Sequence, residues 1–214
     1  MRNEIGSSIH AYWDGLRRGR LLPRRTELNP VAIESALAHL VVAERRVDGP
    51  ARIRIGGIRL CDMAGGSVRA LPLRALWRVE EQERIERLID TVFTGPSILD
   101  LTCNASANGV VERRAAVTLL PLSDEGGACT RLFGSITVDG PALPRSGLQL
   151  SILRERVTPV RMPTEDYGFE DAQRQTTLAE EPRPFLVAIE GDGGQRSQTE
   201  PRRPRLVLHH GGKR

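Results

Sequence analysis

The sequence is short of aromatic residues, of cysteine and of long apolar runs, and each shortage excludes a class of protein. Aromatic residues make up 4% of its 214 residues, so we see no aromatic platform of the kind that stacks RNA bases. The three cysteines, Cys61, Cys103 and Cys129, are too few and too far apart for a disulfide framework or a zinc site. The chain also has no signal-peptide core and no apolar run of the roughly 18 residues that span a membrane. We therefore expect a cytoplasmic protein without a membrane span.

Basic residues are only slightly in excess, and almost all of them are arginine. The chain has 31 basic and 27 acidic residues, a net charge of +4, and Lys213 is its only lysine. The one undiluted basic cluster lies within 17–25, at the end of a predicted helix whose dipole favours cations. This cluster is either a solvated helix end or a contact for an anion. The overall charge is too low to favour a phosphate backbone, so we do not expect a nucleic-acid partner.

The motifs of the common enzyme classes are missing. The chain has no GxGxxG, Walker, HExxH or GxSxG pattern, and its four histidines include no pair at ligand spacing with a cysteine. His39 is therefore interpreted as a packing or hydrogen-bonding residue, and the glycine pairs at 56–57 and 65–66 as bends. We expect no enzyme, no catalytic residue and no metal site, and the cofactor, if any, is unknown.

An amphipathic helix is predicted near the N-terminus, within residues 1–22. Ser7 and Ser8 can cap it. Its apolar stripe at helical spacing consists of Ile9, Tyr12, Trp13 and Leu16. Such a stripe packs either on the domain's own sheet or on a second copy of the chain. In the second case these four residues are the dimer interface, and removal of 1–22 should give a soluble monomer.

The rest of the domain, 23–139, has the pattern of an α+β fold. Asn29-Pro30 starts a short helix, and Glu-rich 80–93 is the clearest helix, ended by Gly95-Pro96. The five predicted strands cover 40–47, 51–57, 97–106, 110–122 and 131–138, with hairpin turns at Asp48-Gly49 and Ala107–Gly109. We expect one five-stranded antiparallel sheet with helices on one face, behind an N-terminal cap helix.

The composition changes at Gly140. Eight of the 14 prolines lie in 140–214, and apolar periodicity is almost absent there, so we expect a largely disordered tail. Leu148–Leu153 is predicted to add one turn or helix to the fold, and 184–190 is a second short ordered candidate. The terminal RLVLHHGGKR is either a docking peptide that adds a strand to a partner's sheet or an end without function.

The segments 12–30, 36–47 and 52–77 together resemble an alphaproteobacterial PAS-domain family formerly catalogued as a domain of unknown function. The resemblance covers roughly 8–139, and the terminal RLVLHHGG is similar to a signature of many members. Ala38 and Ile58 depart from the family pattern, which has proline and threonine there. The matching positions are Tyr12, Trp13, Leu16, Pro23, Pro30, His39, Leu40, Arg54, Gly57, Leu60 and Gly65.

The resemblance implies a PAS fold, in which a five-stranded sheet and a helical wall enclose a small pocket, and it adds no catalytic residue. Cys61 lacks the surroundings of a flavin-reactive cysteine, and the helix at 80–93 has no histidine for haem. Whether the pocket holds a ligand or its residues fill the core is open. The candidate pocket residues are Leu60, Cys61, Ala64, Trp77, Leu88, Ile89 and Val92.

Two functions of different classes follow. The first is a regulatory, sensory-type module that binds a small ligand or a protein partner and has no attached output domain. The second is a structural adaptor with a filled core that homodimerises through its N-terminal helix. The sequence favours the first, with a homodimer expected in either case.

Overall fold

The computed structural model of the chain describes residues 4–45, 49–107, 111–140 and 147–162, all within the compact unit Met1–Glu165. Its helices are α1 (Glu4–Arg17), α2 (Ile58–Ala64), α3 (Gln82–Thr94) and the 3₁₀ helices η1 (Arg25–Glu27), η2 (Pro30–His39), η3 (Leu73–Leu76) and η4 (Val79–Glu81). Its strands are β1 (Leu40–Glu44), β2 (Arg52–Gly56), β3 (Ser97–Ala107), β4 (Val111–Ser123), β5 (Cys129–Val138) and β6 (Leu148–Pro159).

The strands form one antiparallel sheet in the order β2-β1-β5-β4-β3-β6. The prediction of an antiparallel sheet with helices is confirmed, but two details of it are wrong. The sheet has six strands where five were predicted, and helices cover both of its faces where one face was predicted. The sixth strand, β6, lies where the sequence predicted a turn or helix. The sheet therefore continues past Asp139 to Pro159.

β6 forms because it completes β3, the strand at which the sheet would otherwise end. It pairs with β3 along its whole length, from Ser97 opposite Pro159 to Ala107 opposite Leu148, so the backbone polar groups on that side of β3 find partners. The buried apolar side chains of β6, Leu148, Leu150 and Ile152, lie in its first half, and Val157 in the second half is partly buried against the same core. The second half carries the charged residues typical of an edge strand, which hides the alternation in the sequence.

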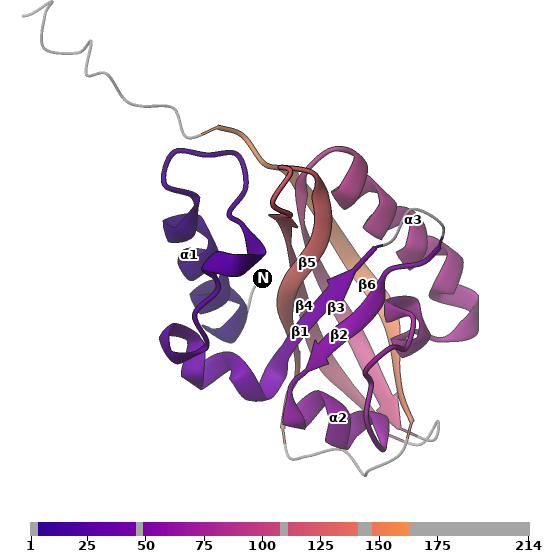
Figure 1. Ribbon diagram of the computed structural model, residues 1–214. Coiled ribbons are helices and arrows are strands. Elements are labelled where there is room, and N and C mark those ends of the chain that lie inside the picture. The colour runs from indigo at the N-terminus through magenta and orange to yellow at the C-terminus, as the bar shows by residue number, and fades with distance from the viewer. Residues whose placement is uncertain (1–3, 46–48, 108–110, 141–146, 163–214) are drawn as a thin grey trace, which may run out of the picture. The chain divides into compact units, whose positions relative to one another are not determined.

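Helices lie on both faces of the sheet (Figure 1), and alternate residues of each strand serve one face or the other. α2, η3 and α3 cover one face, where the inner core includes Leu60, Trp77, Ile85, Ile89, Leu99, Leu119 and Leu150. α1, the predicted N-terminal cap helix, packs with η2 on the opposite face. The outer core there includes Ile9, Trp13, Ile33, Val42, Leu120 and Phe133.

The N-terminal elements differ from the prediction in detail. α1 includes Glu4, so Ser7 and Ser8 lie inside the helix and do not cap it. Asn29 does cap η2, since its side-chain oxygen accepts a hydrogen bond from the Val31 N–H at 3.0 Å. η2 is kinked at Ile33 and has 3₁₀ geometry, where the sequence predicted a simple short helix. The predictions for Asp48, for the turn residues 108–109, and for 184–190 and 205–214 lie outside the described residues.

Candidate functional site

The structure brings all seven predicted pocket residues to one place, the inner core. Four of them are buried in this core and three are partly buried at its margin. The buried ones are Leu60, Trp77, Ile89 and Val92, and the marginal ones are Cys61, Ala64 and Leu88. That these residues form a ligand pocket remains a prediction, because residues that simply fill a core would be grouped in the same way.

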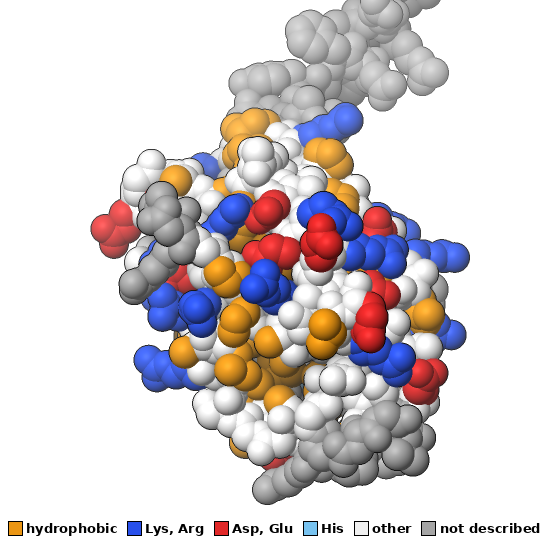
Figure 2. All heavy atoms as spheres, turned by 90° about the vertical axis from the view of Figure 1, so that its right-hand side faces the viewer, with side chains coloured by type: hydrophobic (Ala, Val, Ile, Leu, Met, Phe, Trp, Pro, Cys, Tyr) orange, Lys and Arg blue, Asp and Glu red, His pale blue; other side chains and the backbone are white. Residues whose placement is uncertain are grey.

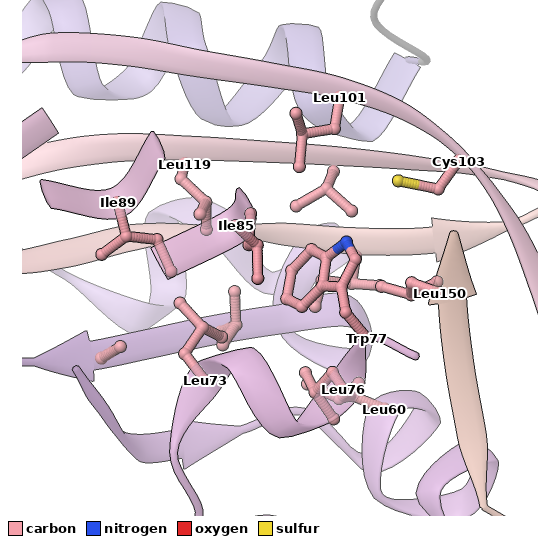
Figure 3. Packing of buried hydrophobic residues seen from close by; sticks show 14 of the residues in the cluster. Leu60, Leu73, Leu76, Trp77, Ile85, Ile89, Leu101, Cys103, Leu119 and Leu150 are labelled. Carbon is pink, nitrogen blue, oxygen red and sulfur yellow. The ribbon is translucent and has the colours of Figure 1, made fainter. Parts of the chain in front are cut away.

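Trp77 is the largest side chain of the inner core and is only 1% exposed. Figure 3 shows its ring surrounded by Leu76, Ile85 and Leu150. The backbone that carries it is fixed by β6, because Trp77 forms a bridge with Leu150 and the Arg78 N–H donates to the Leu150 carbonyl at 3.0 Å. Sequence reasoning named Trp77 but missed the strand that positions it.

The polar atoms near Trp77 are buried and unreactive. Its indole N–H has no hydrogen-bond partner among the described residues, and Cys103 lies on the side of the ring that carries this nitrogen (Figure 3). Burial raises the pKa of Cys103 to about 12. Burial likewise raises the pKa of Cys129 to about 12. Neither thiol is therefore a reactive thiolate near neutral pH.

Four cavities of the described fold lie outside the predicted pocket. None of these four is lined by any of the seven predicted pocket residues. One of about 630 Å³ lies where α3 meets the ends of β3 and β6, beside Pro96 and Val160. The largest, of about 740 Å³, is built from η1, β1, β2, β5, the β4–β5 turn and the segment after α2.

This largest cavity is rich in arginine, and we refer to it as the arginine cleft. Sequence reasoning pointed to two of its residues, Arg24 and Arg25, through the basic cluster at 17–25. The others are far apart in sequence and meet only in the folded chain. Its lining comprises Arg24, Arg25, Arg54, Arg69 and Arg131, the acidic Glu44, Asp124 and Glu125, and Thr26, Val42, Ile55, Ser123 and Gly126.

Two of the five arginines in the cleft share one carboxylate, that of Glu44. Glu44 lies 2.7 Å from Arg54 Nε and 3.2 Å from Arg131 Nη2. Arg24, Arg25 and Arg69, in contrast, form no ion pair with any residue in the described part of the chain. These three guanidinium groups are exposed, so the cleft keeps an excess of positive charge.

The α3 side of the molecule shows that such an excess is not general. Figure 2 views this side, and charged side chains of both signs intermix over it, with apolar side chains gathered below them. Arg87 pairs with Glu83 at 2.7 Å along α3, and Arg84 pairs with Glu155 of β6 at 3.0 Å. Arginines here are matched by nearby carboxylates, unlike the three in the cleft.

The predicted dimer-interface residues lie on α1, and two of them face the chain's own sheet. Ile9 and Trp13 are 0% and 1% exposed in the outer core, and the Trp13 indole N–H donates to the Pro121 carbonyl at 2.7 Å. Tyr12 is half-buried against the same core, and Leu16 is half-buried but belongs to neither core. The stripe thus packs mainly on its own domain, and the dimer interface remains a prediction.

Other site predictions concern metals and membranes. Within the described residues, no three or more His, Cys, Asp or Glu side chains are grouped to hold a metal ion. No described helix is long and apolar enough to cross a membrane. His39 ends η2, and burial lowers its pKa, an effect that the backbone of Ile136 partly offsets. Its Nδ1 has no hydrogen-bond partner in the described part of the chain.

One antiparallel sheet with a wall of short helices and α3 over one face places the protein in the class of small α+β folds. A family model described as PAS domain matches residues 1–137. The chain belongs to this family, whose members are sensory or regulatory modules. β6 begins at Leu148, after the end of the family match.

Solved structures with a similar fold are light-oxygen-voltage (LOV) domains. One studied with a flavin analogue is 13% identical, with a TM-score of 0.42, over 51% of this chain and 83% of that one. A LOV protein of Rhodobacter sphaeroides is 16% identical, with a TM-score of 0.39, over 49% and 61%. The LOV domain of the blue-light photoreceptor Aureochrome1, in its light state, is 15% identical, with a TM-score of 0.37, over 51% and 87%. At these identities the likeness concerns the fold alone, and no curated protein matches the sequence significantly.

Proposed function

We propose that this protein is a regulatory PAS module that acts by binding a protein partner and does not hold a small ligand in its inner core. One observation carries the proposal. The space between the sheet and the helical wall is filled by side chains, with Trp77 at 1% exposure among them.

Sites for drug-sized ligands usually enclose about 300–1,000 Å³. Two cavities of that size, of about 740 and 630 Å³, lie on the described fold, and neither is lined by a predicted pocket residue. To admit a ligand to the inner core, the Trp77 side chain would have to leave its packing. The cost of uncovering so large a buried side chain favours a module that works through its surface.

Native mass spectrometry of the purified full-length protein, before and after denaturation, tests this proposal. We expect a mass that corresponds to polypeptide alone, whether monomer or dimer. A stoichiometric small molecule that is lost on denaturation would overturn the proposal and give the mass of the ligand.

Tryptophan fluorescence gives an independent test. Trp13 and Trp77 are the only tryptophans, so a Trp13→Phe variant reports on Trp77 alone, and a Trp77→Phe variant is the matched control. We expect a metabolite panel to leave the Trp77 emission and the unfolding midpoint unchanged. A saturable change in the first variant that is missing from the second would place a ligand in the inner core.

The alternative, a structural adaptor that homodimerises through α1, has less support. Its interface was predicted on the stripe of α1, and Ile9 and Trp13 of that stripe are buried against the chain's own sheet. A regulatory module that is also a dimer is compatible with the proposal, as are a non-catalytic role and the predicted cytoplasmic location.

A further inference from the structure

We propose that the arginine cleft binds an extended acidic peptide segment of a protein partner. This inference rests on the proposed function and names the chemistry of the partner. It begins from the guanidinium groups of Arg24, Arg25 and Arg69, which line one cavity of about 740 Å³ and form no ion pair with the described residues. Guanidinium groups bind carboxylates through paired, charge-assisted hydrogen bonds.

The positions of these arginines favour a ligand that is extended. Arg24 forms a bridge with Ser123 at the end of β4, beside β5. Arg69 lies in the segment after α2, whose next residue, Ala70, donates its N–H to Ile53 of β2 at 2.8 Å. β5 and β1 lie between β4 and β2 in the sheet, so the strands at the two sides of the cleft are about 14 Å apart at the usual strand spacing. One carboxylate or phosphate cannot meet both sides, whereas about four residues of extended peptide span this distance.

The rest of the lining favours a peptide over a uniform polyanion. Val42 and Ile55 are paired across β1 and β2, and Ile55 is 44% exposed, which gives the cleft an apolar patch for a side chain of the ligand. Glu44, Asp124 and Glu125 also line the cleft. These carboxylates disfavour a continuous phosphate backbone, whereas a peptide can place its acidic residues at the guanidinium groups and uncharged residues elsewhere. We therefore expect carboxylates on both sides of a central apolar residue.

Fluorescence anisotropy with the full-length protein tests the inference. The probe is a fluorescein-labelled peptide, Gly-Glu-Glu-Leu-Glu-Glu-Gly, and the control peptide has glutamine at every glutamate position. We expect saturable binding of the acidic peptide that weakens as salt is added, and at least tenfold weaker binding of the glutamine peptide. Charge reversal at both sides, Arg24→Glu with Arg69→Glu, should weaken binding at least tenfold.

The matched control is Arg59→Glu, because Arg59 is exposed and lies outside the cleft lining. It changes the net charge in the same direction and should alter affinity less than twofold for each charge reversed. Arg24→Gln with Arg69→Gln is a milder pair that removes the charges without reversing them, and it should also weaken binding. Unfolding midpoints of all variants are measured first, so that a loss of binding is not a loss of fold.

Three outcomes would overturn the inference. They are no saturable binding of the acidic peptide, equal binding of the glutamine peptide, and equal loss in the Arg59→Glu control. Tighter, Arg24- and Arg69-dependent binding of a labelled single-stranded oligothymidine would assign the cleft to nucleic acid instead. If native mass spectrometry finds no small molecule but the peptide does not bind, the cleft inference fails while the proposed function stands. A co-purifying ligand would overturn the proposed function whatever the peptide does.

Discussion

Trp77 decides how much free space the inner core contains. Its side chain is 1% exposed, and the strand that fixes its backbone, β6, comes some seventy residues later in the chain. Because protein interiors are close-packed, a residue of this size is either part of the packing or the wall of a cavity. The packing of Trp77 against Leu76 and Ile85 (Figure 3) is that of a filling residue.

Truncation of this side chain should therefore be costly. We expect Trp77→Ala to lower the free energy of unfolding by about 3–5 kcal/mol, from lost burial and from the cavity that remains. Urea denaturation measures this, with Val79→Ala as the control. Val79 is 76% exposed, so its truncation should change stability by no more than about 0.5 kcal/mol. A loss below about 1 kcal/mol for Trp77→Ala would mean that Trp77 is not a packed core residue.

His39 should make stability depend on pH. Burial lowers its pKa below the usual 6.5, so the unfolded chain takes up a proton at a higher pH than the folded one. This contribution to stability is complete above pH 6.5 and is lost as the pH falls through the lower, folded-state value. We expect the free energy of unfolding to fall less steeply from pH 7 to pH 5 in His39→Gln than in the wild type.

The His39 comparison needs the wild type measured in parallel, because Glu86 acts in the opposite sense. Burial raises the pKa of Glu86, so its contribution is lost as the pH rises through that raised value. Subtraction of the two stability curves removes this shared effect. Curves that run parallel between pH 5 and pH 7 would contradict the assignment to His39.

At the scale of elements, β6 connects β3 with the segment that carries Trp77. It pairs with all of β3 and also forms the bridge between Leu150 and Trp77. Without β6, the whole length of β3 would become an open edge, and unpaired edges promote aggregation. The element also follows the region matched by the family model, which ends at residue 137.

Two truncations should separate the role of β6 from that of the residues that follow it. A chain that ends at Met162 keeps β6, and we expect it to retain the unfolding midpoint of the full-length protein. A chain that ends at Gly140 lacks β6, and we expect a lower midpoint together with aggregation. Thermal denaturation with light scattering measures both. Equal midpoints for the two truncations would show that β6 does not stabilise the fold.

At the scale of the whole molecule, α1 covers the sheet and also carries the predicted dimer interface. Removal of residues 1–22 was expected to give a soluble monomer if α1 forms the dimer. The structure makes that experiment ambiguous, because the same deletion uncovers Leu120 and Phe133 of the outer core. A point change on the remaining apolar surface of α1 is therefore the better test.

Leu16 is suitable because it is half-buried and belongs to neither core. If the predicted dimer forms through α1, sedimentation velocity should show a dimer for the wild type and a monomer for Leu16→Asp, with the unfolding midpoint unchanged. Leu21→Asp is the control, since Leu21 is 37% exposed and lies outside the stripe. A wild-type monomer, or a dimer that survives Leu16→Asp, would rule out this interface.

Local patterns in the sequence were sufficient for much of the fold. The alternation in 97–138 predicted β3, β4 and β5, and Asn29-Pro30 predicted the start of η2, because caps and strand periods depend on neighbouring residues alone. The resemblance to the PAS family indicated the seven predicted pocket residues, which lie in or against one core. The motifs between Tyr12 and Gly65 also gave the PAS family, which the family match confirms.

What the tertiary structure alone decided depends on contacts between distant segments. β6 buries three apolar side chains, with Val157 partly buried beside them, and is stabilised by its pairing with β3, some fifty residues earlier. The stripe of α1 was compatible with a dimer or with the sheet, and the outer core of Phe133 and Leu120 determines that Ile9 and Trp13 pack on the sheet. The arginine cleft joins residues from 24 to 131. No local pattern in the sequence predicts this cleft, because its residues come together only through the order of the strands in the sheet. That order exists only once the strands have paired.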